Sequence, residues 1–129
     1  MPFTLEETEA ALAGEDILVL DAPLRAARCL ALQNGRIIGI DRARFENEAE
    51  LRTALIHEGG HFESGAFYCP YSRYQLKAQA EYRADKAAVL HNIPFEELRR
   101  GLQRGDTPAE LAEYLCVTQR FLKKACEIY

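Results

Sequence analysis

Short apolar runs and turn signals fill the first third of the chain. Three of these runs have the length of β-strands, over residues 17–20, 29–32 and 36–40. Asn34-Gly35 separates the last two runs and is typical of a β-hairpin turn. Ahead of them we expect a helix over residues 5–13, with Thr4 as its N-cap and Gly14 as its C-cap. These features predict a small three-stranded, mainly antiparallel sheet that follows one helix.

Helical periodicity begins after residue 46. Asn47 and Glu50 form a variant of the capping box, so a helix should begin near Glu48. Its expected core-facing stripe consists of Leu51, Leu55 and Phe62. A second helix is expected over residues 79–88, where the sequence is rich in alanine and free of glycine and proline. The chain is therefore predicted to be of the α+β class.

The last third of the chain carries three further helix signals. Pro94 should open one helix, and Gly105 should close it. Thr107 and Pro108 provide an N-cap and a first-position proline for the next helix, while Thr118 is the expected cap of the last.

One short segment of the first long helix carries the residue types of a metal site, His57-Glu58-Gly59-Gly60-His61. Histidines four residues apart share one face of a helix and can bind one zinc ion, and Glu58 lies beside them, where it can accept a proton from water. Gly59 and Gly60 each cost a helix about 1 kcal/mol relative to alanine, which suits a place of close approach or a helix end. The alternative is a pair of surface histidines on an amphipathic helix.

A zinc site that hydrolyses peptides needs a third protein ligand and an open position for water. Glu81 and Asp85 are four residues apart on the second helix, so their carboxylates lie on one face. Glu81 follows His61 by twenty residues, a spacing similar to that of thermolysin-like zinc peptidases. The alternative is a solvated helix face, with Lys77 and Lys86 nearby.

From about Gly35 to its end, the chain resembles the ImmA/IrrE family of metallopeptidases. The resemblance rests on the segments 57–61 and 81–85 and on the tail at 107–118, in the order that the family has. Gly59 departs from the family, whose members usually carry a larger apolar residue there. Similar members are associated with phages and mobile elements.

The resemblance implies a minimal zincin-like fold that holds one zinc ion (Zn2+) per chain. It makes His57, His61 and Glu81 the metal ligands. Glu58 becomes the catalytic base, and Asp85 becomes the acceptor for the ring N–H of His57. It also implies an endopeptidase whose protein substrate is a helix-turn-helix repressor of the element that encodes it. We expect one metallopeptidase domain over residues 1–129, in which about 1–92 carry the sheet and zinc site and about 93–129 form a helical extension.

A peptidase of this kind needs a further donor for the oxyanion of its tetrahedral intermediate. The chemically able side chains near the motifs are Tyr68, Tyr71, Tyr74, Arg83 and His91. The sequence does not rank them. The favoured alternative for each tyrosine is a packed ring with its hydroxyl bonded to backbone, and for His91 it is a place at the end of the Glu81 helix, where a cation suits the dipole.

Composition narrows the range of partners. The net charge is −4 and the sequence pI is about 5.4, which argues against a general affinity for nucleic acid phosphates. The chain has no apolar run of membrane-spanning length and no sign of a secretion signal, so we expect a cytoplasmic protein. Four cysteines without Cys-x-x-Cys spacing give little support to a second metal site.

The C-terminal segment provides a rival hypothesis. Residues 111–125 resemble a helix-turn-helix unit, which would make the chain a non-catalytic module that binds DNA or a protein partner. From residue 106 onward, however, acidic side chains outnumber basic ones. The expected recognition helix therefore offers few contacts to phosphates.

Overall fold

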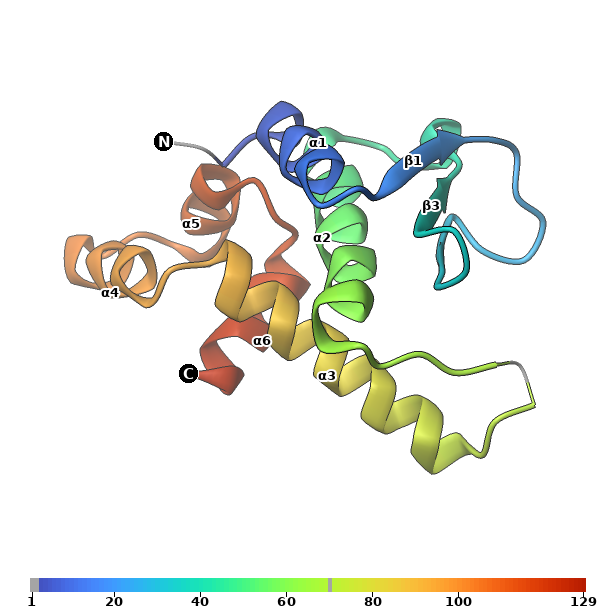
Figure 1. The fold of residues 1–129 in the computed structure, drawn as a ribbon. Coiled ribbons are helices and arrows are strands. Elements are labelled where there is room, and N and C mark those ends of the chain that lie inside the picture. The colour runs from blue at the N-terminus through green and yellow to red at the C-terminus, as the bar shows by residue number, and fades with distance from the viewer. Residues whose placement is uncertain (1–2, 70) are drawn as a thin grey trace.

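The computed structural model describes residues 3–69 and 71–129. In the chain order of these residues, the elements are α1 (Leu5–Gly14), β1 (Leu18–Asp21), β2 (Cys29–Leu32), β3 (Ile37–Ile40), the short 3-10 turn η1 (Arg42–Arg44), α2 (Glu48–Ser64), α3 (Tyr74–Asn92), α4 (Phe95–Arg104), α5 (Pro108–Leu115) and α6 (Gln119–Ile128). Figure 1 shows α2 in the middle of the molecule, with α3 crossing below it. The α+β class is confirmed. Among the described residues, no helix is both long and apolar enough to cross a membrane.

The sheet is mixed, which corrects the expectation of a mainly antiparallel one. Its strand order is β1-β3-β2. The predicted hairpin is confirmed, since β2 pairs antiparallel with β3 and Gly35 takes the left-handed φ of 78° in the turn. β1, however, pairs with β3 in parallel, with Leu18 opposite Ile37. Because a hairpin is coded by adjacent residues and the position of β1 is not, only the first pairing was visible in the sequence.

Helix ends follow the capping signals. The side-chain oxygen of each predicted N-cap accepts the backbone N–H three residues later, at Thr4, Asn47, Thr107 and Thr118. Gly65 and Gly105 end α2 and α4 in the left-handed conformation. Gly14 is the last residue of α1, and Glu15 caps that helix instead. Helix α3 begins at Tyr74, five residues before the predicted start.

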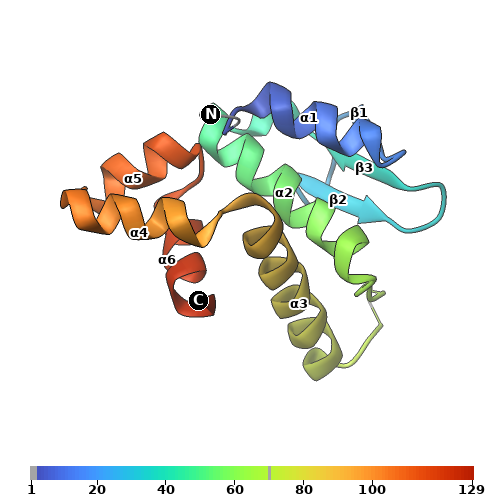
Figure 2. The same cartoon turned by 60° about the vertical axis from the view of Figure 1, so that its left-hand side comes forward.

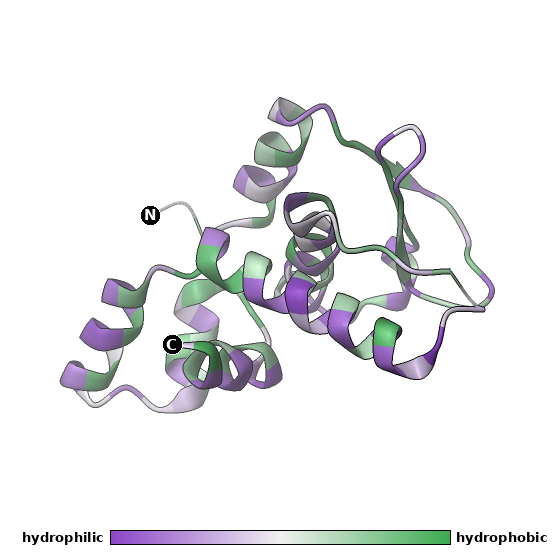
Figure 3. Cartoon of the chain, turned by 60° about the horizontal axis from the view of Figure 1, so that its bottom comes forward, coloured by the Kyte–Doolittle hydropathy of each residue, from purple (hydrophilic) through white to green (hydrophobic). Residues whose placement is uncertain are grey.

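Two hydrophobic clusters flank α2. Figure 2 shows α1 and the sheet on one side of this helix and α4, α5 and α6 on the other, and Figure 3 colours the ribbon by the hydropathy of each residue. One cluster packs α1 and the sheet against Leu51 and Leu55, and Phe62 joins it at the edge. The other cluster contains Ile56 from α2 and Val89 from α3, together with side chains of α4, α5 and α6. Helix α2 thus has a hydrophobic cluster on each of two sides, and it also packs along α3.

Helices α2 and α3 approach so closely that one position between them must be glycine. A Cβ added to Gly60 would lie 2.1 Å from the carbonyl oxygen of Ala84, a backbone atom that cannot rotate away. Gly59 is less constrained, because a Cβ there would lie 3.1 Å from a terminal methyl of Leu12. The helix crossing therefore requires glycine at position 60, whereas Gly59 faces Leu12 of α1.

A buried arginine ties three helices together. Arg52 on α2 is 2% exposed. Its Nε donates to Thr8 Oγ1 on α1 at 2.9 Å, and its Nη1 donates to the carbonyl oxygen of Leu115 at the end of α5 at 2.6 Å. Burial lowers the pKa of this guanidinium. The positive charge sits at the negative end of the α5 dipole, which stabilises it.

Candidate metal centre

The side chains of His57, His61 and Glu81 converge between α2 and α3. Each offers a ligand atom, and these atoms all lie within 4.8 Å of one another. The Nε2 of His57 is 2.8 Å from Glu81 Oε2, and the Nε2 of His61 is 3.4 Å from Glu81 Oε1. The four-residue spacing predicted that the two histidines share one face of α2 and that Glu81 and Asp85 share one face of α3. The crossing of α2 and α3 brings these two faces together.

The second nitrogen of each imidazole is held by a hydrogen bond. His57 Nδ1 lies 2.8 Å from Asp85 Oδ1, and His61 Nδ1 lies 2.7 Å from the backbone carbonyl oxygen of Ala66. Because a carbonyl only accepts, His61 Nδ1 carries a proton, which leaves Nε2, on the side of Glu81, as the nitrogen that can bind a metal. Oriented Nε2 lone pairs are what a metal requires of histidine.

This donor set fits zinc. Ligand atoms around a tetrahedral zinc ion with bonds of 2.0–2.1 Å stand about 3.3 Å apart, and the two histidine–glutamate separations are 2.8 Å and 3.4 Å. Two imidazoles and one carboxylate are the ligands of sites that keep a fourth position open. His61 is 6% exposed, so one of the three side chains is shielded from water.

Glu58 projects beside this cluster and has no ligand role in it. Within residues 3–69 and 71–129 its carboxylate makes no hydrogen bond or ion pair. Burial raises its pKa, and the nearby His57 and His61 oppose this rise. A half-buried carboxylate with a raised pKa and free oxygens is suited to take up and return a proton.

Two pockets meet at Glu58. One pocket has a volume of about 360 Å³ and lies along β2. The residues that line it include Leu30, His61, Phe67, Tyr68 and Glu81. The other, of about 480 Å³, lies against α6 and contains His57 and Asp85. Glu58 therefore lines both pockets.

Asp85 contacts His57 on the side of the ring that faces away from Glu81. Its side chain is 12% exposed, and its second oxygen, Oδ2, lies 2.8 Å from Lys124 Nζ on α6. Burial alone would raise the pKa of Asp85, but the hydrogen bonds from His57 and Lys124 hold it below its usual value. The pKa of His57 is raised, since the contact with Asp85 and the charges of Glu58 and Glu81 outweigh the opposing effect of burial.

Of the five expected oxyanion donors, the structure brings one to the centre. The hydroxyl of Tyr68 donates to Glu81 Oε1 at 2.6 Å, and this bond raises the pKa of Tyr68 to about 12. Tyr71 and Tyr74 are 95% and 84% exposed. Arg83 lines two other pockets, one of which shares Phe67 and Tyr68 with the pocket along β2, but neither is lined by Glu58.

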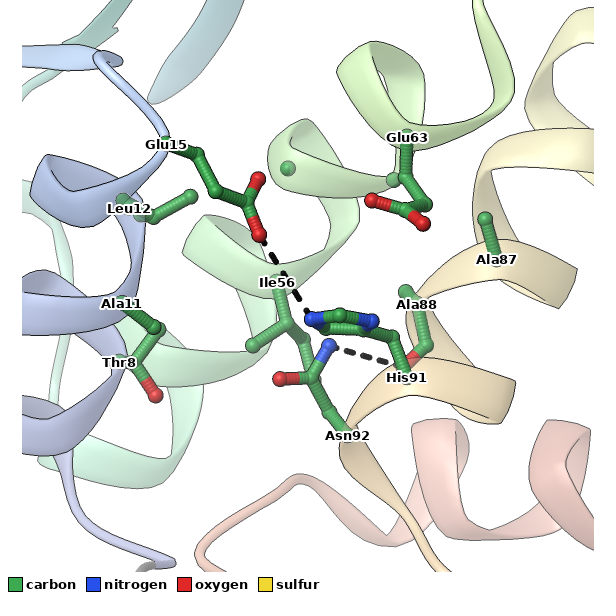
Figure 4. A pocket seen from close by; sticks show the side chains of 12 residues that line it. Thr8, Ala11, Leu12, Glu15, Ile56, Glu63, Ala87, Ala88, His91 and Asn92 are labelled. Carbon is green, nitrogen blue, oxygen red and sulfur yellow. Dashed lines mark hydrogen bonds and ion pairs between the residues drawn. The ribbon is translucent and has the colours of Figure 1, made fainter.

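His91 lies on another side of α2, in the group drawn in Figure 4. Its Nε2 is 3.7 Å from Glu15 Oε1, at a small pocket that Glu63 also lines. These three side chains also have metal-ligand types and lie close together, but all three are exposed. No hydrogen bond orients their ligand atoms among the described contacts, in contrast to the cluster on His57.

Sequence reasoning missed two contributors to the centre. Lys124 is 39 residues from Asp85 in the chain, and no local spacing connects them. Ala66 follows Gly65, the left-handed residue that caps α2. Its contact with His61 uses a backbone carbonyl, which any residue type has, so the sequence does not mark it. The glycine that ends α2 was the available signal, because a left-handed turn folds the chain back onto the last helical turn.

Comparisons with protein-family models, with curated proteins and with solved structures gave no match. The geometry of the chain's own residues is therefore what supports a function.

Proposed function

We propose that this chain is a zinc-dependent endopeptidase of the ImmA/IrrE type. The observation that carries the proposal is the arrangement of four groups: the oriented Nε2 atoms of His57 and His61, the Glu81 carboxylate between them, and the free carboxylate of Glu58 at the meeting point of two pockets. A purely structural zinc site would have a fourth protein ligand, and none is among these groups.

Each side chain of the candidate site has a separate role in the proposed peptide hydrolysis. When bound by His57, His61 and Glu81, a zinc ion supplies Lewis acidity, which acidifies water and polarises a carbonyl. Glu58 accepts the proton of the attacking water as the oxygen bonds to the peptide carbon. The C–N bond then breaks, and Glu58 returns the proton to the departing amine. Asp85 and the carbonyl of Ala66 keep both imidazoles in the required tautomer.

Strand β2 is suited to hold the substrate backbone. It is an edge strand of the sheet, pairs only with β3 among the described strands, and lines the pocket that contains Glu58. An extended peptide can add to such an edge through main-chain hydrogen bonds. Leu30 and Phe67 in this pocket favour an apolar side chain next to the cleaved bond.

The resemblance suggests a helix-turn-helix repressor as the protein substrate, and the geometry weakens the rival DNA-binding role. In a helix-turn-helix protein, the first residues of the recognition helix contact the bases. Here Thr118, Arg120 and Phe121 at the start of α6 line the pocket that contains His57. That surface of α6 faces the candidate site.

Metal content is the first test. Elemental analysis of the purified chain should find about one zinc per chain, and Glu81→Ala and His61→Ala should lose it. His91→Ala is the matched control, because it removes a histidine outside the cluster and should retain zinc. If the native chain stays free of zinc after reconstitution, the proposal fails.

Cleavage is the second test. The zinc-loaded chain should cut the repressor encoded beside it at a discrete bond. Glu58→Gln should retain zinc but leave the repressor intact, since the amide cannot take up the proton. Equal cutting by native protein and Glu58→Gln would contradict the assigned role of Glu58.

A further inference from the structure

The last helix reaches the candidate metal centre through one side chain. Lys124 on α6 places Nζ 2.8 Å from Asp85 Oδ2, and Asp85 Oδ1 lies 2.8 Å from His57 Nδ1. One carboxylate is therefore shared by a cation on one side and a metal-ligand imidazole on the other. Neither contact is a surface ion pair, because the Asp85 side chain is 12% exposed.

The geometry of Asp85 depends on having both partners. A buried carboxylate with one unpaired oxygen would rotate toward solvent, and this rotation would move Oδ1 away from His57. With Lys124 bound to Oδ2, the carboxylate plane is fixed and Oδ1 stays aimed at the imidazole. Fixing that ring also fixes the direction of its Nε2, the atom offered to a metal.

The contact with Asp85 costs the Lys124 ammonium little desolvation free energy. Its side chain is 40% exposed, so the ammonium keeps part of its hydration while it contacts Asp85. The stem is held by a helix whose core side chains Phe121, Leu122 and Ala125 are buried. The position of Lys124 is therefore set by the packing of α6 and not by the metal centre itself.

We propose that Lys124 is a positioning residue, which holds Asp85 so that His57 keeps a metal-binding orientation. The inference rests on the proposed zinc site and extends it to the C-terminal helix. Removing an outer partner of a metal-ligating histidine typically lowers metal affinity 10- to 100-fold, and Lys124 stands one step further out. A loss of about 10-fold is therefore expected on its removal.

The test measures zinc affinity by competition with a chromophoric chelator, on the full chain. Lys124→Met should weaken zinc binding about 10-fold, and Lys124→Arg, which keeps the positive charge, should recover most of the affinity. Lys123→Met is the matched control, since it removes an exposed lysine one position away on the same helix and should leave affinity unchanged.

A double-mutant cycle separates positioning from general loosening of α6. If Lys124 acts through Asp85, Lys124→Met should have little further effect in an Asp85→Asn background. Additive losses, or unchanged affinity in Lys124→Met, would overturn the inference while the zinc site stands. A native chain that binds no zinc would overturn the site and the inference together.

Discussion

At the residue scale, local spacing predicted which side chains share a helix face, but it did not predict the contacts of Lys124 and of the Ala66 carbonyl. His57 and His61, and Glu81 and Asp85, are each four residues apart, so helical geometry alone places each pair on one face. That these two faces meet depends on the crossing of α2 and α3, which no short motif encodes. Spacing also did not distinguish among Tyr68, Tyr71 and Tyr74, because all three lie in or beside one loop. Only the folded chain shows that Tyr68 contacts Glu81.

Tyr68 should affect the metal centre through Glu81. Tyr68→Phe removes the 2.6 Å hydrogen bond to Glu81 Oε1, so the carboxylate is freer to rotate and zinc affinity should fall, by up to about 10-fold. Chelator competition measures this change. Tyr71→Phe and Tyr74→Phe are the controls, because both rings are exposed and should leave the affinity unchanged. Equal effects from the three substitutions would refute the specific role of Tyr68.

At the element scale, capping residues predicted most of the helix boundaries. The pairing of β1 with β3 was not predicted. N-caps and the Asn34-Gly35 turn act within a few residues, where side-chain oxygens and left-handed backbone decide the outcome. The parallel pairing of β1 with β3 closes a longer stretch of chain, and both strands have similar apolar patterns. The early start of α3 at Tyr74 was missed because no capping side chain marks it.

The two central glycines should respond differently to alanine. Gly60→Ala brings a methyl to 2.1 Å from the Ala84 carbonyl, so α2 and α3 must separate, at a cost of about 3 kcal/mol or more. Gly59→Ala meets only a flexible Leu12 methyl and gains helix propensity worth up to about 1 kcal/mol. Urea unfolding of both variants measures the difference. Similar losses in the two variants would contradict the close crossing.

At the scale of the whole molecule, Arg52 connects parts that are far apart in the chain. Arg52→Met leaves Thr8 Oγ1 and the Leu115 carbonyl without this donor, and should lower the free energy of unfolding by about 3 kcal/mol. Arg99→Met is the control, because among the described residues Arg99 pairs only with the exposed Glu96, and its loss should leave the midpoint nearly unchanged. An unfolding midpoint in Arg52→Met equal to that of the native chain would refute this role.

Zinc should stabilise the whole fold, since its proposed ligands come from two helices that the unfolded chain does not hold together. At a free zinc concentration one hundred times Kd, the stabilisation is about 2.7 kcal/mol, or roughly 10 °C in Tm. Thermal unfolding with zinc and with EDTA measures it. His61→Ala should show no such shift, while His91→Ala should show the full one.

The contact of Gly60 with the Ala84 carbonyl also sets the axial register of two helices. Ala84 lies three residues after Glu81 and one before Asp85, so the backbone contact is fixed within one turn of both carboxylates. A slide of α3 by one turn, about 5.4 Å, would move Asp85 to where Glu81 stands and leave His57 Nδ1 without an acceptor. The absence of a side chain at Gly60 thus fixes the axial position of α3 on α2, and with it the positions of both the Glu81 and the Asp85 carboxylates relative to His57.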